Sequence, residues 1–148
     1  MTIHTHEMAF KADKLRADHR TFERRFADIC RRAREGDWHD LDAVWGPFTR
    51  DIEDHLAFEE REVFPAYCHE GPECRSLVEA LTAQHAEIRR TLERLGLEIQ
   101  LKAVRAPTIE AFIELMRRHA TIENARIYPW LASADLWRSM HESPSAAP

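Results

Sequence analysis

Apolar residues recur along most of the chain with the three- and four-residue spacing of amphipathic helices. The pattern predicts four long helices, over about residues 8–34, 40–65, 73–104 and 107–129. Gly36 is expected to end the first helix, and the second begins near Asp40 or after Pro47. Long helices joined by short loops predict an all-α fold, an antiparallel up-down-up-down four-helix bundle.

The second half of the chain repeats the first. "HLAFEEREVFP" (55–65) matches "HATIENARIYP" (119–129), and "DHRTF" in the first helix matches "QHAEI" in the third. The repeat predicts a bundle with a pseudo-two-fold axis, spanning residues 8–140. Residues 1–7 and 141–148 are expected to be flexible ends. "SADLWRSMH" is expected to add a short C-terminal helix with Ser133 as its N-cap.

Polar residues interrupt the apolar stripe of every predicted helix. One histidine lies in each stripe, and in two helices a glutamate follows it four residues later: His19, His55 with Glu59, His85, and His119 with Glu123. An offset of four on a helix leaves two side chains about 40° apart and roughly 6 Å along the axis. Each His-Glu pair therefore points to one place inside the bundle.

Four imidazoles and two carboxylates in one core need compensation. Burying an unpaired polar group costs on the order of 2 kcal/mol or more, and an isolated carboxylate costs far more, against a total stability of about 5–15 kcal/mol. A bound metal ion would accept electron pairs from both ligand types. The alternative is a metal-free interaction bundle whose polar core is a hydrogen-bonded network.

The ligand types narrow the choice of metal. No cysteine belongs to the pattern, which disfavours copper(I) and thiolate zinc sites, and Ca²⁺ or Mg²⁺ prefer all-oxygen sites. Imidazole with carboxylate suits iron, manganese and zinc. Six ligands exceed what one tetrahedral Zn²⁺ uses, so two ions bridged by carboxylates are expected.

Composition excludes several other classes. The chain has 148 residues, 44% hydrophobic and 32% charged, and a net charge of −5 with mixed signs, which does not favour nucleic-acid binding. It has no apolar run of about 20 residues and no secretion signal, so neither a membrane nor export is expected. The three cysteines have no metal-type spacing and are expected to be reduced in a cytoplasmic protein, although a bond between Cys68 and Cys74 is conceivable.

These segments resemble the hemerythrin-like, or HHE cation-binding, domain family from about Ala12 to Leu131. The resemblance rests on "DHR", "HLAFEEREVFP", "QHAEIRR" and "RHATIENARIYP". It implies a four-helix bundle holding two iron ions bridged by an oxo or hydroxo group, with manganese or zinc as substitutes. His19 and His55 would then bind one iron and His85 and His119 the other, with Glu59 and Glu123 bridging the two.

One position departs from the oxygen carriers of that family. They have a second histidine four residues after the helix-three ligand, where this chain has Arg89. An open position on each iron is therefore expected, or one filled by Glu23, four residues after His19. The resemblance implies a protein that binds or senses O₂, NO, peroxide or iron. The alternative is an oxidoreductase with peroxidase-like, catalase-like or oxygen-reducing activity.

Overall fold

The computed structural model describes the backbone of residues 3–133 and the side chains from residue 11 onward. The described residues are helical and contain no strand. The four long helices are α1 (Ile3–Glu35), α2 (Trp38–Phe58), α4 (Pro72–Gln100) and α5 (Ala106–Ile122). The short elements are η1 (Glu59–Val63), α3 (Phe64–Cys68), η2 (Glu123–Ile127) and α6 (Tyr128–Leu131).

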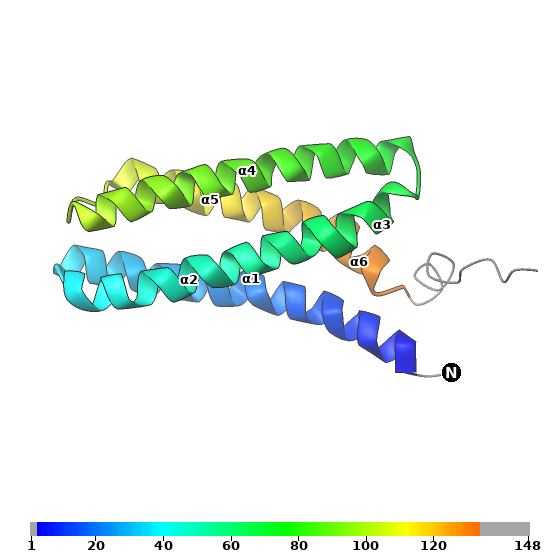
Figure 1. Cartoon of the computed structure of the whole chain (residues 1–148), viewed down its shortest axis with the longest axis horizontal. Helices are drawn as coiled ribbons and strands as arrows, with labels where there is room; N and C mark the ends of the chain where they lie inside the picture. Colours follow the sequence, from blue (N-terminus) through cyan, green and yellow to red (C-terminus); the bar gives the residue numbers. More distant parts are fainter. Residues whose placement is uncertain (1–2, 134–148) are drawn as a thin grey trace, which may run out of the picture.

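The long helices form the predicted antiparallel bundle. Figure 1 shows the turns from α1 to α2 and from α4 to α5 at one end, and the turn through α3 at the other end, near the start of α1. The stripe residues predicted from the sequence fill the core, among them Phe22, Ile52, Leu81 and Phe112, each no more than 4% exposed. The apolar spacing therefore identified the buried face of each helix.

Helix ends follow local chemistry in part. α1 ends at Gly36, whose φ of +74° is in the left-handed region, with hydrogen bonds from Gly36 N–H to Ala33 O and from Asp37 N–H to Arg32 O. This is the glycine-ended helix motif that the sequence predicted. The alternative start of α2 after Pro47 is wrong, because Pro47 lies inside α2.

Both histidine-glutamate segments contain a widened π turn, which the sequence reasoning did not anticipate. The N–H of Phe64 bonds to Glu59 O, and the N–H of Tyr128 bonds to Glu123 O, each an offset of five residues. The next residue is a proline in both cases, with no N–H to donate and a ring that would clash with the carbonyl four residues back in a regular helix. The repeated prolines thus accompany a repeated change of helical geometry at the glutamates.

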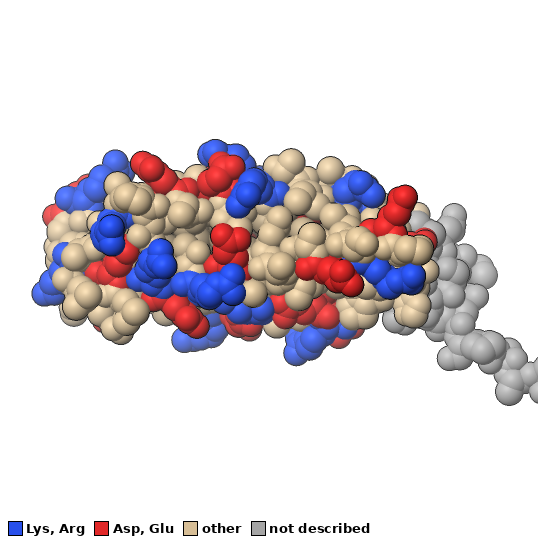
Figure 2. All heavy atoms as spheres, turned by 90° about the horizontal axis from the view of Figure 1, so that it is seen from above, with Lys and Arg blue, Asp and Glu red and all other residues tan. Residues whose placement is uncertain are grey.

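The predicted C-terminal helix lies mostly outside the described residues, and so does the 141–148 tail. α1 begins at Ile3, earlier than the predicted residue 8, and α4 ends at Gln100, earlier than the predicted residue 104. None of the helices in the described part is both long and apolar enough to cross a membrane. Figure 2 shows basic and acidic side chains intermixed over the face that it presents. Cys30, Cys68 and Cys74 are all free thiols.

Candidate metal centre

The six predicted ligand residues meet at one place in the core. Their ligand atoms form two groups of four, each within 4.8 Å of one another: His19, His55, Glu59 and Glu123 in the first group, and Glu59, His85, His119 and Glu123 in the second. The two glutamates belong to both groups. His19 comes from α1, His55 from α2, His85 from α4 and His119 from α5, so each long helix contributes one imidazole.

The two carboxylates each present one oxygen to each group. Glu59 Oε1 lies 3.2 Å from His55 Nε2, whereas Glu59 Oε2 lies 3.3 Å from His85 Nε2. Glu123 Oε2 lies 3.2 Å from His19 Nε2, whereas Glu123 Oε1 lies 2.8 Å from His119 Nε2. Both carboxylates therefore have the arrangement needed to bridge two cations.

Three of these ligand atoms have no hydrogen-bond partner within the part of the chain that the structure describes. His55 Nε2, Glu59 Oε2 and Glu123 Oε1 are buried and have no hydrogen-bond partner among the described residues. His85 Nε2 and His119 Nε2 lie 3.1 Å apart, a contact that is a hydrogen bond only if one of the two nitrogens carries a proton. Buried lone pairs directed at a common point are what a bound cation requires. The residues present therefore fit a metal ion in each group.

Outer partners orient three of the four rings. His55 Nδ1 lies 2.9 Å from Asp18 Oδ2, His85 Nδ1 lies 2.9 Å from Glu60 Oε1, and His119 Nδ1 lies 2.9 Å from Gln84 Oε1. A ring whose Nδ1–H donates to such an acceptor leaves its Nε2 lone pair for a metal. These three acceptors turn each Nε2 toward the centre.

His19 is the exception. Its side chain is only 9% exposed, yet its Nδ1 has no hydrogen-bond partner in the described part of the chain. The ring packs near the rings of His55 and Tyr128, with centroid distances of 4.9 Å and 5.5 Å. One of the four histidines therefore lacks the outer acceptor that the other three have.

A family model for the hemerythrin HHE cation binding domain matches residues 11–131. The chain belongs to the hemerythrin HHE cation-binding domain family. No curated protein and no solved structure matches the chain. Family membership and the buried His/Glu cluster together make this a metal-binding helical protein.

Tyr128 brings a hydroxyl group into the HHE centre, the cluster of the four histidines and two glutamates described above. Its oxygen lies 2.6 Å from Glu59 Oε1, 2.8 Å from Glu123 Oε2 and 3.1 Å from His19 Nε2. In a regular helix, Glu123 and Tyr128 would be about 140° apart, and the π turn η2 brings them to one face. The only signal in the sequence for a role of Tyr128 is its position before the repeated proline. The matching residue in the first half, Phe64, lacks the hydroxyl and packs 5.1 Å from His85.

Arg89 and Glu60 close one side of the HHE centre. Arg89 binds Glu53 and Glu60 at 2.8 Å, and Glu60 in turn holds His85. These contacts keep the pKa of the Glu60 carboxyl low in spite of partial burial, which by itself raises it. Glu23, the proposed extra ligand, is exposed and belongs to neither group of four.

The buried charges shift the pKa values of the centre. Burial alone would lower the pKa of His55, but attraction to Glu59 and hydrogen bonding to Asp18 outweigh it and raise that pKa to about 10. The pKa of His85 is likewise raised to about 9, against the effect of burial, by its contacts with Glu123 and Glu59. Burial tends to raise the pKa of Glu123, but attraction to His119 dominates and holds it well below its ordinary value. The metal-free centre thus balances its carboxylates with imidazolium protons.

Proposed function

We propose that the chain holds two iron ions at a carboxylate-bridged centre and there binds or senses O₂, NO, peroxide or iron. The observation that supports this most strongly is the division of the six residues into two overlapping groups that share Glu59 and Glu123. Each group offers two imidazole nitrogens and two carboxylate oxygens, a donor set that suits iron. Bound iron would supply a redox-active centre with affinity for small oxidants.

The second group lacks the third histidine of the family's oxygen carriers. Arg89 stands where the oxygen carriers of the family have an additional histidine, and it is held away from the second group by Glu53 and Glu60. That group is therefore left with two histidines rather than three. An incomplete ligand set favours a site that reacts with or senses a small molecule over a simple reversible carrier.

Metal analysis tests the proposal directly. The protein is expressed with iron, and its metal content and near-ultraviolet absorption are measured beside a His119→Ala variant. A His69→Ala variant is the matched control, because His69 is exposed and lies outside the centre. We expect two irons per chain in the wild type and the control, and loss of iron in His119→Ala. Metal-free protein of unchanged melting temperature would contradict the proposal.

An oxidoreductase acting on peroxide or O₂ is the second candidate. A cavity of about 740 Å³ between α1 and α5 reaches the ligand His19, which gives a reactant a route to the first group. Steady-state peroxide consumption by the iron-loaded protein, absent in His119→Ala, would support this activity. Binding of NO or O₂ without turnover would assign the protein to the binding class instead.

A further inference from the structure

The two halves of the centre are closed differently. On the side of His85, Arg89 bridges Glu53 and Glu60 and so ties α4 to the α2 segment. The sequence repeat pairs His85 with His19 and His55 with His119, and residues at the same offsets from these histidines are therefore equivalent. By that alignment Glu23 replaces Arg89, Arg117 replaces Glu53, and Asn124 replaces Glu60.

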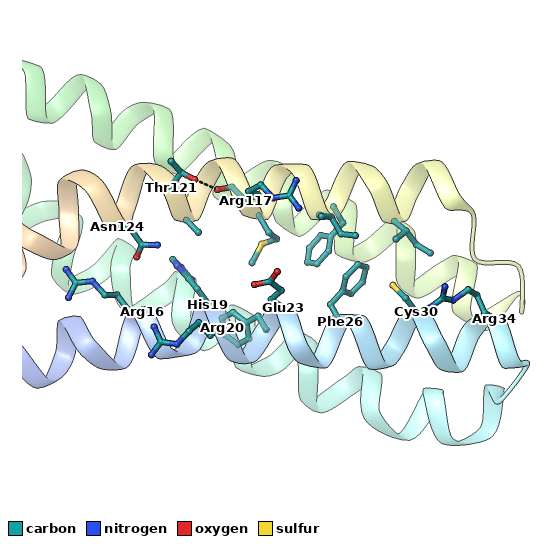
Figure 3. Close-up of a pocket in the computed structure, with 17 residues that line it drawn as sticks. Arg16, His19, Arg20, Glu23, Phe26, Cys30, Arg34, Arg117, Thr121 and Asn124 are labelled. Carbon is teal, nitrogen blue, oxygen red and sulfur yellow. Dashed lines mark hydrogen bonds between the residues drawn. The ribbon is translucent and has the colours of Figure 1, made fainter.

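These equivalent residues do not close the other half. No hydrogen bond or ion pair joins Glu23, Arg117 and Asn124 in the described part of the chain; Arg117 pairs instead with Glu114 at 3.6 Å. All three line the cavity of about 740 Å³ between α1 and α5. Figure 3 shows Glu23 and His19 pointing from α1 toward α5, with Asn124 on the facing helix. The cavity thus occupies the position that corresponds, in the repeat, to the bridge of Arg89 with Glu53 and Glu60.

The cavity combines an apolar floor with a cationic rim. Phe22, Phe26 and Phe112 form buried parts of its lining. Its charged lining residues are four arginines and one glutamate: Arg16, Arg20, Arg34, Arg117 and Glu23. That gives a formal charge of +3 in a chain whose net charge is −5. Arg20 and Arg34 have no ion-pair partner among the described residues. Arg16 and Arg20 lie at one end of the cavity and Arg34 at the other (Figure 3). A concave, largely apolar site of this size is typical of small-molecule sites, and the excess of arginine along its rim favours anions.

His19 supplies the second observation. Its Nδ1 is the one ring nitrogen of the four that lacks an outer acceptor, and the residue equivalent to the acceptor Glu60 is the exposed Asn124. His19 also lines the cavity. A carboxylate bound at this end of the cavity would lie beside His19 and Arg20, both of which line it.

We propose that the cavity between α1 and α5 binds a free organic anion, with an apolar body over the phenylalanine floor and a carboxylate at the Arg20 end beside His19. Such a ligand would complete the side of the centre that the protein itself leaves open. The proposal concerns this cavity and does not depend on which metal occupies the centre.

Calorimetric titration with decanoate tests the proposal on the full chain as purified, with the uncharged decanamide as the comparison ligand. We expect one decanoate per chain, binding at least tenfold more tightly than decanamide, with the affinity falling as salt is raised. Arg20→Gln should weaken decanoate binding about two- to fivefold, since Arg20 is exposed. Arg50→Gln, an exposed arginine of α2 outside the cavity, should leave it unchanged.

Two further variants locate the ligand. Ala27→Trp fills the cavity lining and should weaken decanoate binding at least tenfold, whereas Ala43→Trp, on the exposed surface of α2, should not. The triple variant Glu23→Arg, Arg117→Glu, Asn124→Glu installs on the His19 side the bridge that Arg89 makes on the His85 side, and should abolish binding. Retained helicity and metal content in each variant show that the fold persists. Equal binding of decanoate and decanamide, or full binding by Ala27→Trp or by the triple variant, would overturn the proposal, whether or not iron is present.

Discussion

Metal binding should displace protons from His55 and His85. In the metal-free protein the raised pKa values of about 10 and about 9 make each imidazole more than about 95% protonated at pH 7.5. A metal ligand must be neutral. Loading both groups at pH 7.5 should therefore release about two protons per chain from these two residues.

The direction with pH follows from the same shifts. Because the pKa values are raised, protons compete with metal at all pH values below about 9, and this competition disappears above about 10. With two protons exchanged, the joint affinity for the metal pair should fall roughly a hundredfold for each pH unit below about 9. The unperturbed imidazole pKa of about 6.5 would have placed the onset of metal loss more than two units lower.

Titration of the metal-free protein with Zn²⁺, which has no redox chemistry, gives the number of protons. Calorimetry at pH 7.5 in two buffers of different ionisation enthalpy measures the release, and the same titration at pH 10.5 is the control. We expect about two protons at pH 7.5 and about 0.3 proton at pH 10.5, where only His55 is still partly protonated. Fewer than one proton at pH 7.5, or the same release at both pH values, would refute the charge balance inferred for the core.

Three further outcomes are expected. Below pH 6.5 the raised imidazole pKa values stabilise the metal-free fold fully, and this stability is lost as pH rises through about 9 to 10. Urea unfolding of the metal-free protein should therefore give a smaller free energy of unfolding at pH 10 than at pH 6.5. Tyr128→Phe removes a hydroxyl bonded to two buried carboxylates and should lower the free energy of unfolding of the metal-free protein by about 1–3 kcal/mol. The helix content should not change, because the equivalent position of the first half of the chain already holds a phenylalanine, Phe64. An unchanged denaturation midpoint would contradict this. Glu60→Ala removes the acceptor that orients His85 and should lower the affinity for one metal ion by about 10–100-fold in a chelator competition. Glu62→Ala changes an exposed neighbour and should leave the affinity unchanged. Equal effects of the two variants would show that Glu60 does not orient His85.

The bundle and the six clustered residues could be predicted because both depend on local periodicity. A histidine at a core position of each helix is visible in the spacing, and so is a glutamate four residues later. The positions that the spacing marked as buried, such as Phe48 and Ile88, are fully buried in the structure. Convergence of the ligands then follows from the packing of four amphipathic faces against one another.

The outer partners could not be predicted in the same way. Asp18 holds His55 across 37 positions of the chain, and Glu60 holds His85 across 25. Such pairings depend on the relative rotation of two helices, which periodicity does not define. Glu60 is partly buried against His85, whereas its sequence neighbours Arg61 and Glu62 are exposed, and nothing in the local sequence separates the three.

The sequence repeat shows which outer partners the two halves of the chain share and which they do not. Asp18 and Gln84 occupy equivalent positions, each just before a histidine of its own helix, and each accepts from the histidine of the following long helix. That acceptor is therefore present in both halves of the chain.

Two other positions differ between the halves: Phe64 corresponds to Tyr128, and Glu60 corresponds to Asn124. The bundle itself does not require different residues at these equivalent positions. The differences fall on the side of His19, where the hydroxyl lies, the outer acceptor is missing and the cavity reaches the centre. The surroundings of the two groups of ligand residues are therefore chemically unequal, and the cavity is lined by a histidine of the first group.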